Sequence, residues 1–158
     1  MRDDSFIKAK GYLLQEQSLY KALRTMVSRE LEAIVLNCDM EELLALIEAK
    51  VPLIAQLESL AEAWQNLLSE LDIRETYGTA VFWQKFLTLF PPDQADFLSQ
   101  RLLENRAAAE NLMEAEGKAE SELRKHVDHL REKMRSMSRG RKAFITYTKM
   151  GGAQCDEL

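Results

Sequence analysis

The chain has little of what turns and strands require. Glycine and proline together supply 9 of its 158 residues, and neither occurs between residues 12 and 51. A β-sandwich or barrel needs a turn signal about every 8–12 residues, so this gap excludes an all-β fold and disfavours an α/β fold. Leucine occurs 24 times, against 17 for valine, isoleucine and threonine combined, a ratio that favours helices over strands. The sequence predicts an all-α protein.

Cysteines and long apolar runs are also scarce. The two cysteines, Cys38 and Cys155, are too few and too far apart for a disulfide framework or a zinc site. No apolar run approaches the roughly 20 residues of a transmembrane helix. The first residues lack the continuous apolar stretch of a secretory signal. We therefore expect a cytoplasmic protein without stable membrane insertion.

Charge is unevenly spread along the chain, with one segment that is net positive. The net charge is −5, yet residues 118–149 carry 10 Lys/Arg and 4 Asp/Glu. An acidic chain of this kind predicts no nucleic-acid binding. The basic segment has two interpretations: cations that stabilise a helix C-terminus, or the rim of a surface that binds an acidic or amphipathic partner.

Three long helices are predicted from apolar spacing. The first runs from near Ser5 to Leu36 and the second begins at Asp39, a capping residue. In the second helix an apolar stripe recurs every three or four residues from Leu44 to Leu71. Pro52 lies inside it and predicts a kink or break near Lys50. Residues 72–92 form an irregular connection with one short aromatic helix over 79–89.

The last long helix is expected over residues 93–138, with Gly140 ending it. Within it five apolar residues follow each other at steps of 4, 3, 4 and 3, the spacing of a coiled-coil seam. This 123–137 seam consists of Leu123, Val127, Leu130, Met134 and Met137. A further apolar set, Phe144, Ile145 and Tyr147, follows it.

These elements predict an elongated antiparallel helical bundle, or long helical hairpin, with a short aromatic helix in the middle. Residues 1–150 are expected to form a single domain, and residues 151–158 a disordered tail.

Catalytic and metal-binding motifs are weak. His126 and His129 could place two nitrogens on one helix face for a metal, but basic neighbours repel a cation. They also lack the lysine and small residue that follow the histidine in phosphotransfer bundles, which leaves that function a minor alternative. No glycine-rich phosphate or dinucleotide motif and no nucleophile elbow occurs. We expect no enzyme, no metal and no cofactor.

The order of several elements resembles the FlgN family of flagellar export chaperones. These elements are Glu30, the run Asp39-Met-Glu-Glu-Leu-Leu, Lys50, Leu53-Ile54-x-x-Leu57, Asn105, Asn111 and Tyr147-x-x-x-Gly151. The resemblance covers nearly the whole chain, with a variable middle at residues 72–92.

This resemblance implies a cytosolic, non-enzymatic chaperone. Its partners are hook-associated junction proteins, whose amphipathic C-terminal segments it binds before export, and the flagellar export gate. Client binding maps to the 123–137 seam and to Phe144, Ile145 and Tyr147, with Tyr147 as the residue that docks at the gate.

The alternative interpretation is a structural coiled-coil adaptor or homodimeric scaffold without an unfolded client. Exposed heptad seams would then pair with each other, and a homodimer remains open in either case.

Overall fold

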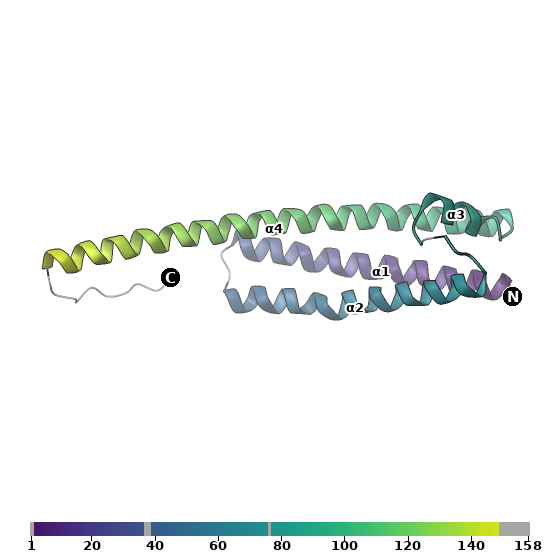
Figure 1. Ribbon diagram of the computed structural model, residues 1–158, viewed down its shortest axis with the longest axis horizontal. Coiled ribbons are helices and arrows are strands. Elements are labelled where there is room, and N and C mark those ends of the chain that lie inside the picture. The colour runs from purple at the N-terminus through teal and green to yellow at the C-terminus, as the bar shows by residue number, and fades with distance from the viewer. Residues whose placement is uncertain (1, 37–38, 76, 149–158) are drawn as a thin grey trace. The chain divides into compact units, whose positions relative to one another are not determined.

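In a computed structural model, the described residues form four α-helices (Figure 1). They are α1 (Arg2–Val35), α2 (Met40–Glu70), α3 (Ala80–Leu87) and α4 (Pro92–Thr148). The structure describes the backbone of residues 2–36, 39–75 and 77–148, and the side chains of residues 3–36, 39–75 and 77–140. No strand occurs in these residues, which confirms the predicted all-α class.

The chain divides into two units, Met1–Ala119 and Glu120–Leu158. The first, the N-terminal unit, contains α1, α2, α3 and the first part of α4; the second, the C-terminal unit, contains the rest of α4. Whether residues 1–150 act as one domain stays a prediction. The predicted tail, residues 151–158, lies outside the described residues. Within the described part of the chain, no helix combines the length and hydrophobicity needed to cross a membrane.

α2 begins where the sequence predicts and continues through its proline. Asp39 is the N-cap, and its carboxylate accepts a hydrogen bond from the backbone N–H of Glu41 at 3.4 Å. The helix then runs to Glu70 with Pro52 inside it, so of the predicted kink or break near Lys50 the break does not occur. Buried residues lie on both sides of the proline, Leu43 before it and Leu60 after it. Their packing holds both halves in place despite the missing backbone donor.

α4 is longer than predicted, because Gly140 does not end it. The helix continues to Thr148. A glycine ends a helix when it adopts the left-handed conformation, and among the described glycines only Gly78 has a positive φ, at 91°. In a helix interior glycine costs about 1 kcal/mol relative to alanine, which a helix of 57 residues tolerates.

α1 and α2 lie side by side and antiparallel in the N-terminal unit (Figure 1). Lys8 near the start of α1 pairs with Glu70 at the end of α2, at 3.3 Å. Glu30 near the end of α1 pairs with Lys50 in the first half of α2, at 2.7 Å. These two ion pairs show that α1 and α2 run antiparallel along their shared length, and the buried Glu30–Lys50 pair constrains their register.

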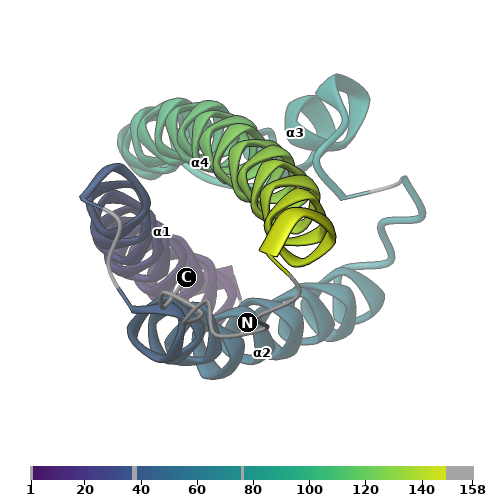
Figure 2. The same cartoon turned by 90° about the vertical axis from the view of Figure 1, so that its left-hand side faces the viewer.

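The first part of α4 runs parallel to α1. Gln17 donates a hydrogen bond to Glu104 at 3.2 Å, and seven residues further along both helices Arg24 donates to Asn111 at 2.8 Å. Figure 2 shows this part of α4 along the helix axes, with α3 to its side. The N-terminal unit is therefore an up-down-up arrangement of three helices.

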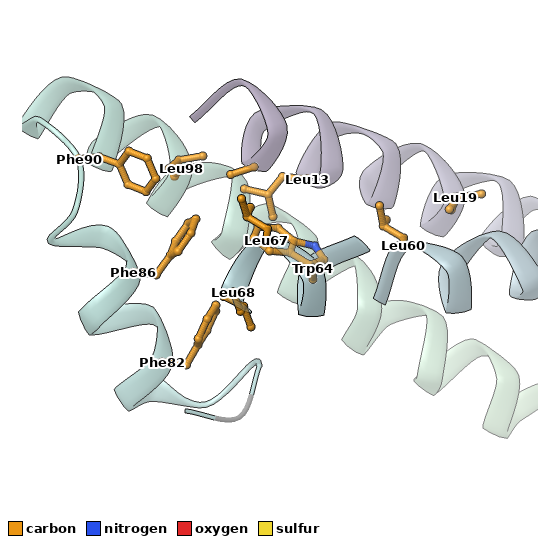
Figure 3. Close-up of a cluster of buried hydrophobic side chains, with 11 residues drawn as sticks. Leu13, Leu19, Leu60, Trp64, Leu67, Leu68, Phe82, Phe86, Phe90 and Leu98 are labelled. Atoms are coloured by element: carbon orange, nitrogen blue, oxygen red, sulfur yellow. The ribbon is translucent and has the colours of Figure 1, made fainter. Parts of the chain in front are cut away.

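Aromatic side chains from α2, α3 and the following turn fill one end of this unit (Figure 3). The ring centroid of Phe86 lies 5.7 Å from that of Trp64 on α2. It lies 5.7 Å from the ring centroid of Phe82 and 5.0 Å from that of Phe90. Thr79 caps α3, because its hydroxyl accepts a hydrogen bond from the backbone N–H of Phe82 at 3.2 Å. The predicted short aromatic helix thus forms and closes the core.

Replacing Phe86 by alanine tests this core. Phe86 is fully buried, so Phe86→Ala should lower the free energy of unfolding by about 3–5 kcal/mol. Urea denaturation followed by circular dichroism measures the loss. Val81→Ala on the same helix is the control, because Val81 is 54% exposed and its truncation should cost much less. Equal losses in the two variants would contradict the described packing.

Candidate partner-binding surface

The 123–137 seam lies on one helical segment of the C-terminal unit. Leu123, Val127, Leu130 and Met137 are partly buried, and Met134 is 51% exposed. No residue between Glu120 and Gly140 is buried. The seam therefore forms no part of a closed core in the described residues.

The remaining predicted contact residues are Phe144, Ile145 and Tyr147. Their backbone belongs to α4, which continues the seam's helix beyond Gly140. Their side chains lie outside the described residues. Because the helix is continuous, these positions extend the same helical segment instead of forming the separate stretch that the sequence suggested.

Basic side chains flank the seam. Arg124, Arg131 and Lys133 are all exposed, and Arg124 pairs with Glu120 on its own helix at 2.8 Å. Exposed pairs of this kind contribute about 0.3–0.5 kcal/mol, so a partner can replace them at little cost. α4 ends at Thr148, beyond most of the basic residues of segment 118–149. This weakens the interpretation that these residues stabilise the helix C-terminus, since the helix dipole acts within the last turn.

A buried ion-pair cluster joins the three helices of the N-terminal unit. Lys50 of α2 lies 2.7 Å from Glu30 of α1 and 3.0 Å from Glu116 of α4. The Glu30 and Lys50 side chains are 7% and 11% exposed, whereas Glu116 is 42% exposed. Burial lowers the pKa of Lys50, but the bonds to the two carboxylates outweigh it and raise the pKa above its usual value. The lysine is held in its charged form.

Two asparagines that the sequence singled out also join helices. Asn105 is buried, and its amide donates a hydrogen bond to the backbone carbonyl of Leu13 at 2.8 Å. Asn111 accepts one from Arg24 at 2.8 Å. Glu30, Lys50, Asn105 and Asn111, which the resemblance identified, therefore position the helices and do not line the seam.

A tyrosine–carboxylate cluster lies beside a cavity of about 240 Å³ between α1, α3 and α4. Tyr77 donates a hydrogen bond to Glu16 at 3.2 Å. Burial raises the pKa of Glu16 above its usual value. Burial and the nearby Glu16 raise the pKa of Tyr20 to about 12, and the same causes raise that of Tyr77. Sequence reasoning missed this cluster, because nothing in the spacing of Glu16, Tyr20 and Tyr77 indicates that they meet.

The candidate metal ligands of the sequence, His126 and His129, lie among the described residues. No group of three or more His, Cys, Asp or Glu side chains there could hold a metal ion. His126 is partly buried and His129 exposed, both on the same helical segment as the seam.

These features define an all-α protein. Its three-helix core is joined by ion pairs and a buried amide hydrogen bond, and a heptad seam lies outside this core on α4. The chain belongs to the FlgN family, whose model, described as FlgN protein, matches residues 1–154. Members of this family are flagellar export chaperones. The resemblance inferred from the sequence is thereby confirmed. Neither the curated proteins nor the solved structures compared with the chain include a match.

Removal of the buried ammonium group tests the ion-pair cluster. Lys50→Met leaves Glu30 buried without a cation and should lower the free energy of unfolding by about 3–5 kcal/mol. Glu116→Gln should cost about 1 kcal/mol or less, because Glu116 is 42% exposed and water screens its charge. The double variant Glu30→Leu/Lys50→Met should recover most of the loss, since no uncompensated charge remains. Urea denaturation at neutral pH measures all three; a Lys50→Met variant no weaker than Glu116→Gln contradicts the assignment.

Alkaline titration tests the tyrosine cluster. Because the pKa of Tyr20 is raised from 10 to about 12 in the folded protein, its contribution to stability is complete below pH 10. That contribution is lost as the pH rises towards about 12. Phenolate absorbance of the folded protein should show a late component near pH 12 that Tyr20→Phe removes, while Tyr77 titrates at still higher pH. Glu16→Gln should shift that component to lower pH, because it removes the neighbouring charge. An unchanged late component in Tyr20→Phe would contradict the assignment to Tyr20.

Proposed function

We propose that this chain is a cytosolic flagellar export chaperone that binds the amphipathic C-terminal segments of hook–filament junction proteins. It keeps these segments from assembling before export and delivers them to the export gate. The observation that supports this proposal is the 123–137 seam, which is available on a protein of the FlgN family.

The spacing of the seam suits a helical client. Residues at steps of 4, 3, 4 and 3 lie along one side of a helix, and an amphipathic helix binds through apolar anchors at the same spacing. Met134 and Met137 add flexible, polarisable side chains that adapt to different partners. A client segment that is unfolded before export loses conformational entropy on binding. Burial of its apolar face against the seam must exceed that cost.

The residues after the seam complete the proposed surface. Phe144 and Ile145 would extend client contact along α4, while Tyr147 would dock at the export gate. The basic side chains beside the seam would favour clients with acidic residues next to their apolar face. They would also repel segments that are themselves basic.

Charged substitutions in the seam test this function. Leu130→Glu/Met134→Glu should abolish capture of a junction protein, because two carboxylates would have to be desolvated in the interface. The matched control is Ser121→Glu/Ser136→Glu, which adds the same charge at exposed positions outside the seam. Co-purification with a full-length junction protein, and with one lacking its C-terminal segment of about 40 residues, measures capture.

The wild-type chain and the control should retain the full-length client and lose the truncated one. Circular dichroism and thermal unfolding should be the same for all variants, since no residue from 120 to 140 is buried. Capture by the seam variant, or capture of the truncated client by the wild type, would overturn the proposal. Failure of every form to bind would favour the adaptor or scaffold alternative.

A further inference from the structure

α2 carries an apolar stripe that the N-terminal unit leaves exposed. The α2 stripe consists of Met40, Leu44, Ile47, Val51 and Ile54, of which all but the partly buried Ile47 are between 44% and 61% exposed. Four of these five residues belong to the apolar stripe that the sequence shows from Leu44 to Leu71. The structure instead turns the neighbouring set inward, which includes the buried Leu43 and the ion-paired Lys50. The α2 stripe is therefore available for a partner.

The α2 stripe has the same spacing as the 123–137 seam. Its residues follow each other at steps of 4, 3, 4 and 3, as do those of the seam. Both sets span 14 residue steps, or about 21 Å of helix. In heptad terms the first, third and fifth residues of each set occupy d positions, and the other two occupy a positions. The two surfaces can therefore interdigitate in one register over their full length.

The charges that flank the two sets are opposite in sign. The e positions beside the α2 stripe are occupied by Glu41 and Glu48, both exposed. Those beside the seam hold Arg124 and Arg131. On its other side the seam has His126 and Lys133 at g positions, whereas the g positions of α2 hold the buried Leu43 and the ion-paired Lys50. Because e and g residues select coiled-coil partners, this pattern favours pairing of the stripe with the seam.

The same charges oppose pairing of like with like. Two seams would place arginine and lysine side chains against each other, and two α2 stripes would place glutamates together. Like charges across a helical interface act as repulsive elements that reject a partner. Of the three pairings open to this chain, only the stripe with the seam brings opposite charges together.

We propose that the α2 stripe of one copy of this chain is the docking site for the 123–137 seam of a second copy. Each copy carries both surfaces, and because the two surfaces differ, the contact between copies is heterologous. The proposal does not rest on the proposed chaperone function, since no client takes part in it.

The oligomeric state of the full chain tests the proposal. Sedimentation velocity over a wide concentration range should show a monomer–dimer equilibrium that weakens as salt is added, because exposed charges contribute to it. Val51→Glu should weaken the dimer by roughly tenfold or more. Val81→Glu is the matched control, with the same substitution at a similarly exposed site on α3, and should dimerise as the wild type does.

Charge reversal identifies the two surfaces. Glu41→Lys/Glu48→Lys should weaken the dimer, and so should Arg124→Glu/Arg131→Glu/Lys133→Glu. The chain that combines all five substitutions should regain it, because opposite charges again meet. A monomer at every concentration would overturn the proposal, as would a dimer that Val51→Glu leaves intact. A dimer that the seam reversal strengthens by itself would also overturn it, because that outcome indicates pairing of two seams.

Discussion

The register of the N-terminal unit depends on a largely buried ammonium group that is neutralised from two helices. Lys50 on α2 remains charged because the buried carboxylate of Glu30 of α1 lies within ion-pair distance, and the partly exposed Glu116 of α4 adds a second, weaker pair. Hydrophobic contact is non-directional, so leucines alone would allow the helices to slide past each other by a turn. An ion pair and a buried amide such as Asn105 do not allow it. The polar contacts thus fix the register of the three helices, whereas the apolar contacts hold the helices together.

This constraint also explains why apolar side chains remain on the surface. The position of Lys50 determines which side of α2 faces α1 and α4, and Leu43 lies on that side. Leu44 and Val51, one residue further on from each of them, are therefore turned outward. At the other end of α2 no such conflict exists, because Trp64 and Leu68 pack into the aromatic cluster. The exposed stripe follows directly from the placement of the buried charge.

The sequence predicts the helices and the aromatic connection well, because these depend on local signals. Asp39 caps α2 and Thr79 caps α3, and the aromatic residues that follow Thr79 recur at helical spacing. Apolar periodicity does not predict which face is buried in the first half of α2. Two apolar sets lie one residue apart there, and the inward-facing set contains Lys50. Glu30 and Glu116 lie 20 and 66 residues from Lys50, so no local pattern shows that they meet. The family resemblance singles out Glu30 and Lys50 but not their contact.

The sequence places the end of the last helix before Gly140, whereas α4 ends at Thr148. This difference affects how the 123–137 seam can act. A helix that stopped at Gly140 would leave the seam in its last turns, where helices fray. Since α4 continues to Thr148, the seam lies within a helix that is hydrogen-bonded on both sides. The seam is already helical before binding, so only the partner loses conformational entropy when the complex forms. The smaller entropy loss favours affinity. A preformed seam can hold one helix at a time along its length. An unfolded client and a second copy of the chain would therefore exclude each other from it.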